Sequence, residues 1–222
     1  MKISMKVILV GFLALFCVGN ALAGTMKDPR DGKTYKTVKI GNQVWMAENL
    51  NYKMGVEKRH NGLVVDGSWC YGDKPANCKK YGRLYSYRFA KIACPDGWHL
   101  PSERESLVFL EAVKKRADYM EIQRELSGKP LREGENLPTN HLRSVRWKGG
   151  FDSFGFSALP AGIIYGIGGD GNLYSDLGEE AGFWSENGDG YVLLIKRLPE
   201  GYRTIYDTAR STKGYSIRCL KD

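Results

Sequence analysis

A glycine-rich stretch from about Gly162 to Gly190 carries most of the side chains in this sequence that could bind a ligand. Its glycines let backbone groups approach a ligand closely, and its tyrosines offer flat rings for stacking. Its carboxylates and amides can hydrogen-bond to hydroxyl groups. We therefore predict a binding face made of Asp170, Asn172, Tyr174, Glu186, Asn187 and Asp189, with Trp147 at its border.

The acids of this stretch also raise the question of a metal ion, because calcium takes oxygen ligands from loops of this kind. No EF-hand pattern is present, so we predict no metal and no other cofactor, with calcium as the alternative. Gly166, Gly168 and Gly171 fit the G-x-G-x-x-G spacing of dinucleotide-binding loops, which requires a helix directly afterwards. The residues that follow are typical of a loop or strand, so we interpret this segment as a glycine loop without a nucleotide.

The histidines limit the catalytic chemistry that can be expected. Nucleophilic catalysis needs a base beside the nucleophile, and the chain has three histidines. His99 lies between Trp98 and Leu100 and is predicted to be structural, whereas His60 and His141 lie in polar sequence and are predicted to be exposed. No motif fixes the pair of carboxylates that a glycosidase needs. The sequence favours a protein that is not an enzyme, with a secreted enzyme of unrecognised loop chemistry as the alternative.

Residues 1–23 have the pattern of a signal peptide: two lysines, an apolar run, and small residues before a cleavage site after Ala23. Cys17 makes a lipoprotein the alternative, but the bulky Phe16 before it fits such a site poorly. The apolar run is shorter than the ~20 residues that span a bilayer, and no second run of membrane length follows. We expect an exported protein, extracellular, at the cell surface or periplasmic, without a transmembrane segment after cleavage.

Cleavage would leave 199 of the 222 residues and lower the formal charge from +8 to +6. We interpret residues 24–33 as a linker and 34–222 as a single domain, which is long enough for a full core. The basic residues are scattered among the acids, which argues against a nucleic-acid partner. The oligomeric state stays open.

Four cysteines remain after removal of the signal peptide: Cys70, Cys78, Cys94 and Cys219. In an exported chain they indicate two disulfides, with three connectivities open. The short polar loop "CYGDKPANC" favours a bridge between Cys70 and Cys78. A zinc site is disfavoured, because the spacing lacks any C-x-x-C pair.

Alternating polar and apolar residues from Thr34 to Ala47 predict a β-hairpin around a Gly-Asn turn. We expect Val38 and Ile40 on one face, with Val44 and Met46 as their partners. Of the tryptophans, those with apolar neighbours are predicted to be in the core (Trp45, Trp98, Trp184), and those in polar, glycine-flanked segments are predicted to be exposed (Trp69, Trp147).

A capping box of Ser102 and Glu105 predicts the start of a helix. The apolar residues that follow at helical spacing, and that we expect to face the core, are Leu107, Leu110 and Val113. A weaker pattern over 119–126 predicts a second helix. Beyond Trp147, short apolar runs between glycines, among them "GFWSE", "YVLLIKR", "YRTIYDT" and "YSIRCL", predict strands. One α+β domain accounts for this order of elements.

Six ordered blocks resemble the Fibrobacter succinogenes major paralogous domain family: "YKTVKIGNQVWMAENLNY", "GSWCYGDKPANCKKYGRLYSY", "ACPDGWHLPS", "GFSALPAG", "GFWSE" and "YSIRCLKD". The resemblance runs from about Tyr35 to the end. The family comprises exported bacterial domains, often surface-associated and present in many copies, and its sequence pattern is similar to the C-type-lectin-like superfold. That superfold also carries formylglycine-generating enzymes and bacterial adhesins.

The resemblance implies a C-type-lectin-like α+β domain with short twisted antiparallel strands, one principal helix and an N-terminal β-hairpin. It implies a long-range bridge between Cys94 and Cys219, which commits all four cysteines and leaves none for formylglycine-type chemistry. It also implies a non-catalytic binding or adhesion module at the cell surface, whose partner is a polysaccharide or another surface protein. The tripeptides Glu-Pro-Asn, Gln-Pro-Asp and Trp-Asn-Asp of calcium-dependent lectins are absent, so calcium-dependent sugar recognition is not carried over.

Overall fold

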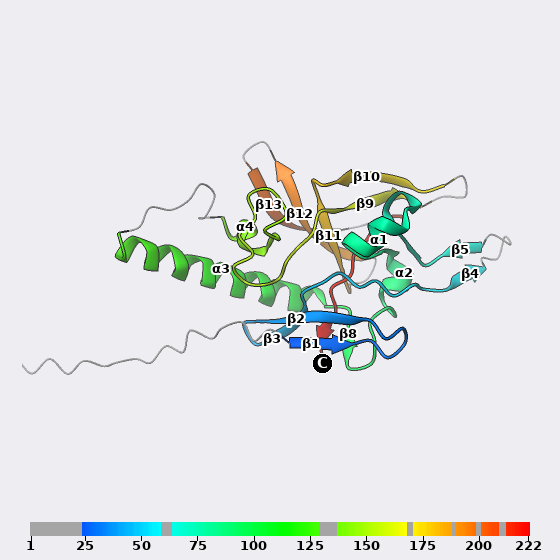
Figure 1. The fold of residues 1–222 in the computed structure, drawn as a ribbon, viewed down its shortest axis with the longest axis horizontal. Helices are drawn as coiled ribbons and strands as arrows, with labels where there is room; N and C mark the ends of the chain where they lie inside the picture. The colour runs from blue at the N-terminus through cyan, green and yellow to red at the C-terminus, as the bar shows by residue number, and fades with distance from the viewer. Residues whose placement is uncertain are drawn as a thin grey trace, which may run out of the picture.

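The computed structural model describes residues 24–58, 64–128, 137–167, 171–187, 190–198, 201–208 and 212–222. The predicted signal peptide over 1–23 and His60 lie outside these ranges. The described chain forms antiparallel sheets and one long helix, so the α+β prediction is confirmed (Figure 1). No helix in the described part of the chain is long and apolar enough to cross a membrane.

The first sheet joins both ends of the described chain. Its strands lie in the order β1 (Gly24–Lys27), β2 (Thr34–Ile40), β3 (Gln43–Met46), β15 (Leu220–Lys221) and β8 (Trp98–His99). The hairpin β2–β3 is as predicted, and Val38 and Ile40 are both buried. Their predicted partners were wrong by one residue, because Val38 lies opposite Trp45 and Ile40 opposite Gln43. The prediction of a linker over 24–33 was also wrong at its start, since Gly24–Lys27 pairs with β2 along its whole length.

A second five-stranded sheet has the order β10 (Leu173–Leu177), β9 (Ala161–Gly166), β14 (Gly214–Tyr215), β7 (Leu84–Ser86) and β6 (Ser68–Trp69). A three-stranded meander follows the chain through β11 (Ala181–Ser185), β12 (Tyr191–Leu198) and β13 (Gly201–Thr208). A small two-stranded sheet pairs β4 (Val56–Lys58) with β5 (Val64–Asp66). The short helices are η1 (Tyr71–Asp73), α1 (Pro75–Tyr81), α2 (Tyr87–Ala90) and α4 (Pro138–Leu142).

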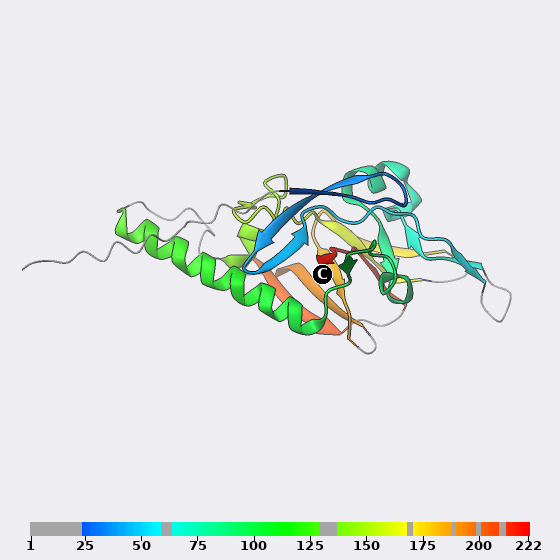
Figure 2. The ribbon, with the colours of Figure 1, turned by 90° about the horizontal axis from the view of Figure 1, so that it is seen from below.

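The principal helix α3 (Glu103–Leu126) begins where the sequence predicted. Ser102 accepts the backbone N–H of Glu105, whose carboxylate accepts the backbone N–H of Ser102, so both members of the capping box are satisfied. The prediction of a separate second helix was wrong, because residues 119–126 continue α3 without a break. The C-terminal half of the helix extends beyond the sheets (Figures 1 and 2).

The buried face of α3 agrees with the predicted one in part. Val113 is buried and Leu110 is partly buried against the core, as predicted, whereas Leu107 was wrong and is 50% exposed. The other buried residues of the helix are Ser106, Phe109 and Ala117. The rotation of the helix is set at its first turn, where the Glu105 carbonyl accepts a hydrogen bond from Gln43 and the Ser106 hydroxyl meets that of Ser185. The apolar pattern alone could not supply those contacts.

Aromatic side chains fill the core between α3 and the sheets. The Phe109 ring lies 4.8 Å from that of Trp45 and 5.0 Å from that of Phe156, measured between centroids. Trp45 and Trp184 are buried as predicted, and Trp98 is partly buried against a second cluster, the one that contains Trp184. The predicted exposure of Trp69 and Trp147 was wrong, because Trp69 is buried with Leu84 and Ile164 and Trp147 is buried in the cluster of Phe109 and Phe156.

Both disulfides connect the predicted cysteines, Cys70 with Cys78 and Cys94 with Cys219. Two disulfides indicate an oxidising, non-cytoplasmic compartment. The long-range bridge closes 125 positions of the chain. It therefore fastens the segment before α3 to the segment that leads into β15.

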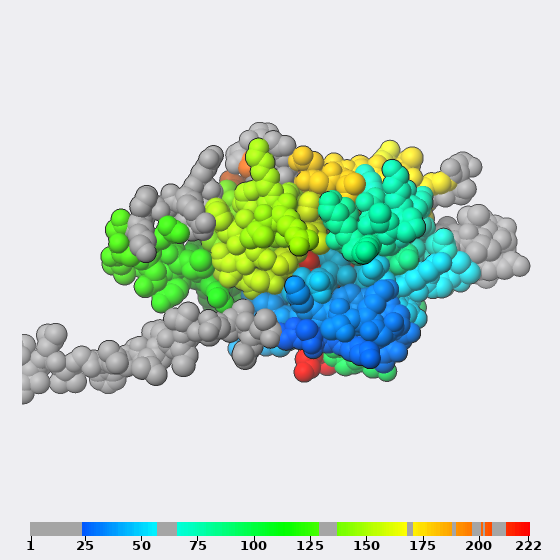
Figure 3. All heavy atoms as spheres, viewed as in Figure 1, coloured from blue at the N-terminus to red at the C-terminus, as the bar shows by residue number. Residues whose placement is uncertain are grey.

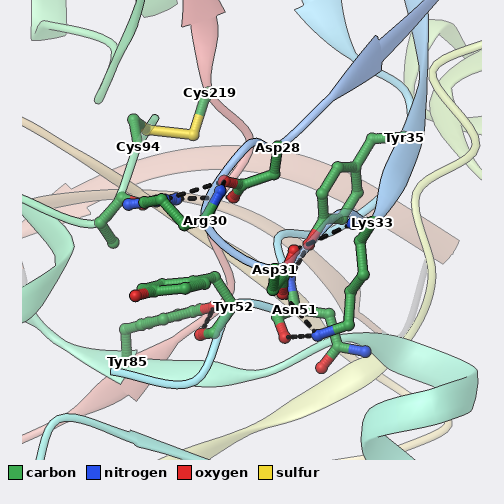
Figure 4. Close-up of polar contacts among 11 residues, drawn as sticks. Asp28, Arg30, Asp31, Lys33, Tyr35, Asn51, Tyr52, Tyr85, Cys94 and Cys219 are labelled. Atoms are coloured by element: carbon green, nitrogen blue, oxygen red, sulfur yellow. Dashed lines mark hydrogen bonds and ion pairs between the residues drawn. A yellow bond between two sulfur atoms is a disulfide. The ribbon is translucent and has the colours of Figure 1, made fainter. Parts of the chain in front are cut away.

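A polar network holds the N-terminal segment beside the long-range bridge (Figure 4). The guanidinium of Arg30 forms a two-pronged ion pair with the buried Asp28 and donates to the carbonyl of Ala93, next to Cys94. It also lies 4.0 Å above the centre of the Tyr52 ring. Residues 24–33 are thus an integral part of the domain.

Candidate functional site

The Cys70–Cys78 segment is a rigid unit on the surface of the second sheet. Gly72 and Asp73 both have positive φ values, 60° and 56°, and the Asp73 N–H donates to the Cys70 carbonyl at 2.9 Å. A non-glycine residue in this conformation is strained, and such strain persists only where neighbouring structure enforces it. The disulfide and the start of α1 at Pro75 supply that enforcement.

This unit places an aromatic pair on the surface. Tyr71 of η1 and Tyr174 of β10 have ring centroids 5.0 Å apart, tilted by 52°. The Tyr174 hydroxyl donates to the Asp73 carboxylate at 2.7 Å, and the Asn172 amide lies 3.4 Å from that hydroxyl. Burial, followed by the hydrogen bond to Asp73, raises the pKa of Tyr174 well above 10, so the phenol stays neutral and keeps its donor. The Cys70–Cys78 loop and strand β10, which are distant in sequence, thus share one polar and aromatic surface.

An apolar layer supports these rings from beneath. Trp69, Leu84, Ala161 and Ile164 are buried together, and Tyr71, Tyr81 and Tyr174 pack against them. Gly162 lies below the ring of Tyr71 with φ of +67°, and a Cβ there would come within 2.6 Å of it. The glycine therefore allows the ring to lie flat on the sheet.

The end of α1 borders a pocket of about 260 Å³ between this helix and the hairpin β2–β3. One wall comes from β2 and the segments around it, and the other from the end of α1; Figure 3 shows these two parts of the chain, blue and teal, meeting on one face. The lining is mostly polar: Lys33, Thr34, Tyr35, Glu48, Asn49, Asn51, Lys79, Lys80 and Tyr81, with Cys78, Gly82 and Leu159.

Hydrogen bonds fix the hairpin wall of this pocket (Figure 4). The Lys33 ammonium donates to the Asp31 carboxylate at 2.8 Å and to the Asn51 carbonyl at 2.7 Å. The Tyr35 hydroxyl accepts the N–H of Asn51 at 3.0 Å, and burial raises the pKa of Tyr35 to about 12. The Asn49 amide donates to the Tyr81 carbonyl at 2.8 Å, which ties the hairpin to the end of α1.

The structure separates the residues that the sequence predicted as one face. Asn172 and Tyr174 lie together at the aromatic pair. Asn187 lies instead at the start of α3, where its side chain hydrogen-bonds to Glu103 and its N–H donates to the Tyr87 hydroxyl.

Of the remaining predicted residues, Glu186 is exposed beside Asn187, and its N–H donates to the Pro101 carbonyl at 2.7 Å. Trp147 is buried beneath Arg143, 3% exposed, and cannot border a surface site. Asp170 and Asp189 lie outside the described residues. Within the described residues, no group of three or more histidine, cysteine, aspartate or glutamate side chains is placed to hold a metal ion.

The histidines of the described chain are engaged in structural contacts. The Nδ1 atom of His99 lies 2.6 Å from Asp222, and its Nε2 atom lies 3.1 Å from Glu105. Ser102, the nearby hydroxyl, donates to Glu105 and caps α3. His99 is satisfied as predicted, and both its ring nitrogens face carboxylates instead of a nucleophile. His141 was predicted to be exposed but is buried in α4, with Nδ1 2.8 Å from the Ser153 hydroxyl.

The comparison with protein families matches residues 38–221 to the Fibrobacter succinogenes major domain. The match covers almost all of the described chain, from the hairpin to the last strand. The chain belongs to this family. The comparison with curated proteins found no match, and neither did the comparison with solved structures.

The family match places the whole Cys70–Cys78 unit, both disulfides and β10 inside the Fibrobacter succinogenes major domain. One wall of the pocket lies partly before it, because Lys33, Thr34 and Tyr35 precede the matched region. In this protein, the segment before the matched domain therefore completes the pocket.

Sequence reasoning missed the pocket of this Fibrobacter succinogenes major domain. Its residues come from four separate stretches, and only the fold brings them together. One signal was available: the adjacent lysines in "NCKKYG" end a short helix that the Cys70–Cys78 bridge must hold in place.

Proposed function

We propose that this Fibrobacter succinogenes major domain is an exported, non-catalytic binding or adhesion module that recognises a polysaccharide at the cell surface. The observation that carries the proposal is the aromatic pair of Tyr71, on the disulfide-locked loop, and Tyr174, on β10, with the Asp73 carboxylate beside it. Aromatic faces stack on sugar rings, and carboxylates and amides accept and donate hydrogen bonds to hydroxyl groups.

We further propose that the scaffold is C-type-lectin-like. Three features support this: an N-terminal hairpin, one principal helix, and a bridge from the segment before that helix to the segment before the last strand. Rigid scaffolds of this kind present binding residues on loops.

The arrangement of the histidines and carboxylates supports binding over catalysis. His99 is held between two carboxylates, and Asp73 is engaged by Tyr174. Neither group is free to act as the base that nucleophilic or glycosidic chemistry requires.

The test is a pull-down and glycan array with the chain from Gly24, followed by titration with the polysaccharide retained. Tyr174→Ala should weaken binding by at least tenfold, about 1.4 kcal/mol, whereas Tyr165→Ala, on the neighbouring strand, should not. Retention of another surface protein in place of every glycan would contradict the polysaccharide, and release of sugar or peptide products would establish an enzyme.

A further inference from the structure

The pocket between the hairpin and α1 carries an excess of positive charge. Three lysines and one glutamate line it: Lys33, Lys79, Lys80 and Glu48. Lys33 is already neutralised in part by Asp31. Lys79 and Lys80 are exposed, and within the described residues neither forms an ion pair. Their ammonium groups are therefore available to an anion.

A buried cation lies behind the same pocket. The guanidinium of Arg218 is fully buried, and its Nε donates to the side-chain oxygen of Asn49, a lining residue, at 2.6 Å. It also donates to three neutral backbone carbonyls, those of Met46, Phe156 and Ser157. Burial lowers the pKa of Arg218 to about 9, with Asp152 and Glu48 opposing that shift, so the group is charged at neutral pH. A buried charge is screened less by salt than an exposed one, and its field adds to that of the lysines.

The helix dipole accounts for part of this arrangement. Lys79 and Lys80 lie in the last turn of α1, where cations are favourable. That interaction leaves their donors facing water, and it does not account for the concave shape of the pocket or for its polar lining. An anionic ligand would use the lysine ammonium groups, the concave shape and the polar lining together.

The uncharged lining suits a sugar ring. Tyr81 provides an aromatic surface, with the Lys80 ammonium 4.7 Å from its ring centre, and Leu159 provides an aliphatic one. Thr34 and Asn51 provide a hydroxyl and an amide. The volume of about 260 Å³ lies just below the range of roughly 300 to 1,000 Å³ of pockets for drug-sized ligands. One sugar unit is a ligand of that size class.

We infer that this pocket binds an acidic sugar unit of a polysaccharide, with its carboxylate at Lys79 and Lys80 and its ring against Tyr81. The inference rests on the proposed function and makes it specific: the polysaccharide is a polyuronate-type chain. Tyr81 lines the pocket and also packs against the same apolar cluster as Tyr71 and Tyr174. A chain of several sugar units would then extend from the pocket towards the aromatic pair.

The test uses two probes with the same sugar chain, an oligogalacturonate and its methyl ester, in which a methyl group replaces the charge of each carboxylate. The oligogalacturonate should bind the chain from Gly24 at least tenfold more tightly than the ester, and its affinity should fall as salt is raised. The double variant Lys79→Ala/Lys80→Ala should lose at least tenfold in affinity for the acid and nothing for the ester. Lys114→Ala/Lys115→Ala, an exposed lysine pair on α3, is the matched control and should bind like the wild type.

Equal affinity for acid and ester, or full binding by Lys79→Ala/Lys80→Ala, would overturn the inference. So would full displacement of the oligogalacturonate by inorganic phosphate at the same concentration, because the pocket would then select a free anion. If the ester binds as tightly as the acid and Tyr174→Ala abolishes binding of both probes, the proposed function survives without this inference. If no glycan binds, the inference and the proposed function both fail.

Discussion

Arg218 and Asn49 are 169 positions apart in the chain and meet at its buried centre, where the guanidinium Nε donates to the amide oxygen at 2.6 Å. The same guanidinium donates to the carbonyls of Met46, Phe156 and Ser157, and the Asn49 amide donates to the Tyr81 carbonyl. One side chain therefore connects the hairpin, the segment before β9 and the C-terminal strand. Through Asn49 it also fixes the end of α1.

Replacing this guanidinium should destabilise the protein strongly. Arg218→Met leaves three buried acceptors and one partly buried acceptor without this donor, and each unsatisfied buried group costs about 1–3 kcal/mol. We expect a loss of at least about 3 kcal/mol in the free energy of unfolding, measured by denaturant titration. Arg104→Met, at an exposed position of α3, is the control and should stay within about 0.5 kcal/mol of the wild type. A near-neutral Arg218→Met would show that the apolar surroundings compensate.

The contacts of His99 predict a pH-dependent stability. Partial burial lowers the pKa of His99, but the hydrogen bond to Asp222 and the charge of Glu105 outweigh it, so the pKa is raised above 6.5. A raised pKa stabilises the folded state below about pH 6.5, and this contribution disappears as pH rises through the folded pKa. Burial raises the pKa of Glu105, but Ser102 and then His99 outweigh it, so that pKa lies below 4.5. The contribution of Glu105 is present above about pH 4.5 and is lost as pH falls through the lowered pKa.

His99→Gln should therefore destabilise the protein most between about pH 5 and 6 and progressively less towards pH 8. The measurement is the melting temperature of wild type and variant across this range. A difference that is constant with pH would mean that the ring acts by packing alone.

Truncation of Phe109 and truncation of Leu107, both near the start of α3, should have different effects on the free energy of unfolding. Phe109 is fully buried against Trp45 and Phe156, so Phe109→Ala should cost about 3–5 kcal/mol. Leu107 is 50% exposed, so Leu107→Ala should cost about 0.5 kcal/mol or less. Urea titration of both variants measures the difference. If Leu107→Ala destabilises the protein more than Phe109→Ala does, Leu107 faces the core as the sequence pattern predicted.

The two disulfides should contribute unequally to stability. In the chain-entropy model, a bridge that closes 125 positions stabilises by about 5 kcal/mol and one that closes 8 by about 2.5 kcal/mol. Cys94→Ala/Cys219→Ala should therefore lower the free energy of unfolding more than Cys70→Ala/Cys78→Ala does. The order should be reversed for glycan affinity: loss of the shorter bridge should weaken binding more, because that bridge holds Tyr71 and α1. The affinities of both variants are compared at one temperature below both melting transitions.

The sequence predicted the elements that depend on local signals. The hairpin turn, the capping box at Ser102 and the strands β11, β12 and β13 follow from neighbouring residue types, and all are present. The disulfide between Cys94 and Cys219 came from the family resemblance and is present as well. Errors arose where tertiary contacts decide. The register opposite Val38, the rotation of α3 and the burial of Trp147 each depend on what packs against them.

The candidate site was predictable only in part. Tyr174 and the Cys70–Cys78 loop were each recognisable as surface features, but their contact through Asp73 joins residues 101 positions apart. Glu186 and Asn187 come directly after β11 and lie at the start of α3, whereas Tyr174 lies in β10. Residues that are close in sequence here therefore lie at different places on the surface. The pocket combines residues on both sides of the N-terminal boundary of the matched domain, which no single motif describes.

The bridge between Cys94 and Cys219 also determines how the domain would respond to tension. A force applied at residues 24 and 222 passes from the N-terminal segment through the disulfide to the last strand, because the covalent link bypasses everything between the two cysteines. The bypassed 125 positions would otherwise extend by roughly 400 Å at about 3.3 Å per residue. Helix α3, the meander and Tyr174 lie inside this closed segment, whereas Tyr71, Asp73 and the lysines of the pocket lie before Cys94, on the loaded part of the chain. Tension that extends residues 24–93 would therefore separate Tyr71 from Tyr174 and release a bound ligand, while the segment from Cys94 to Cys219 stays folded as long as the bond between the two sulfur atoms is intact.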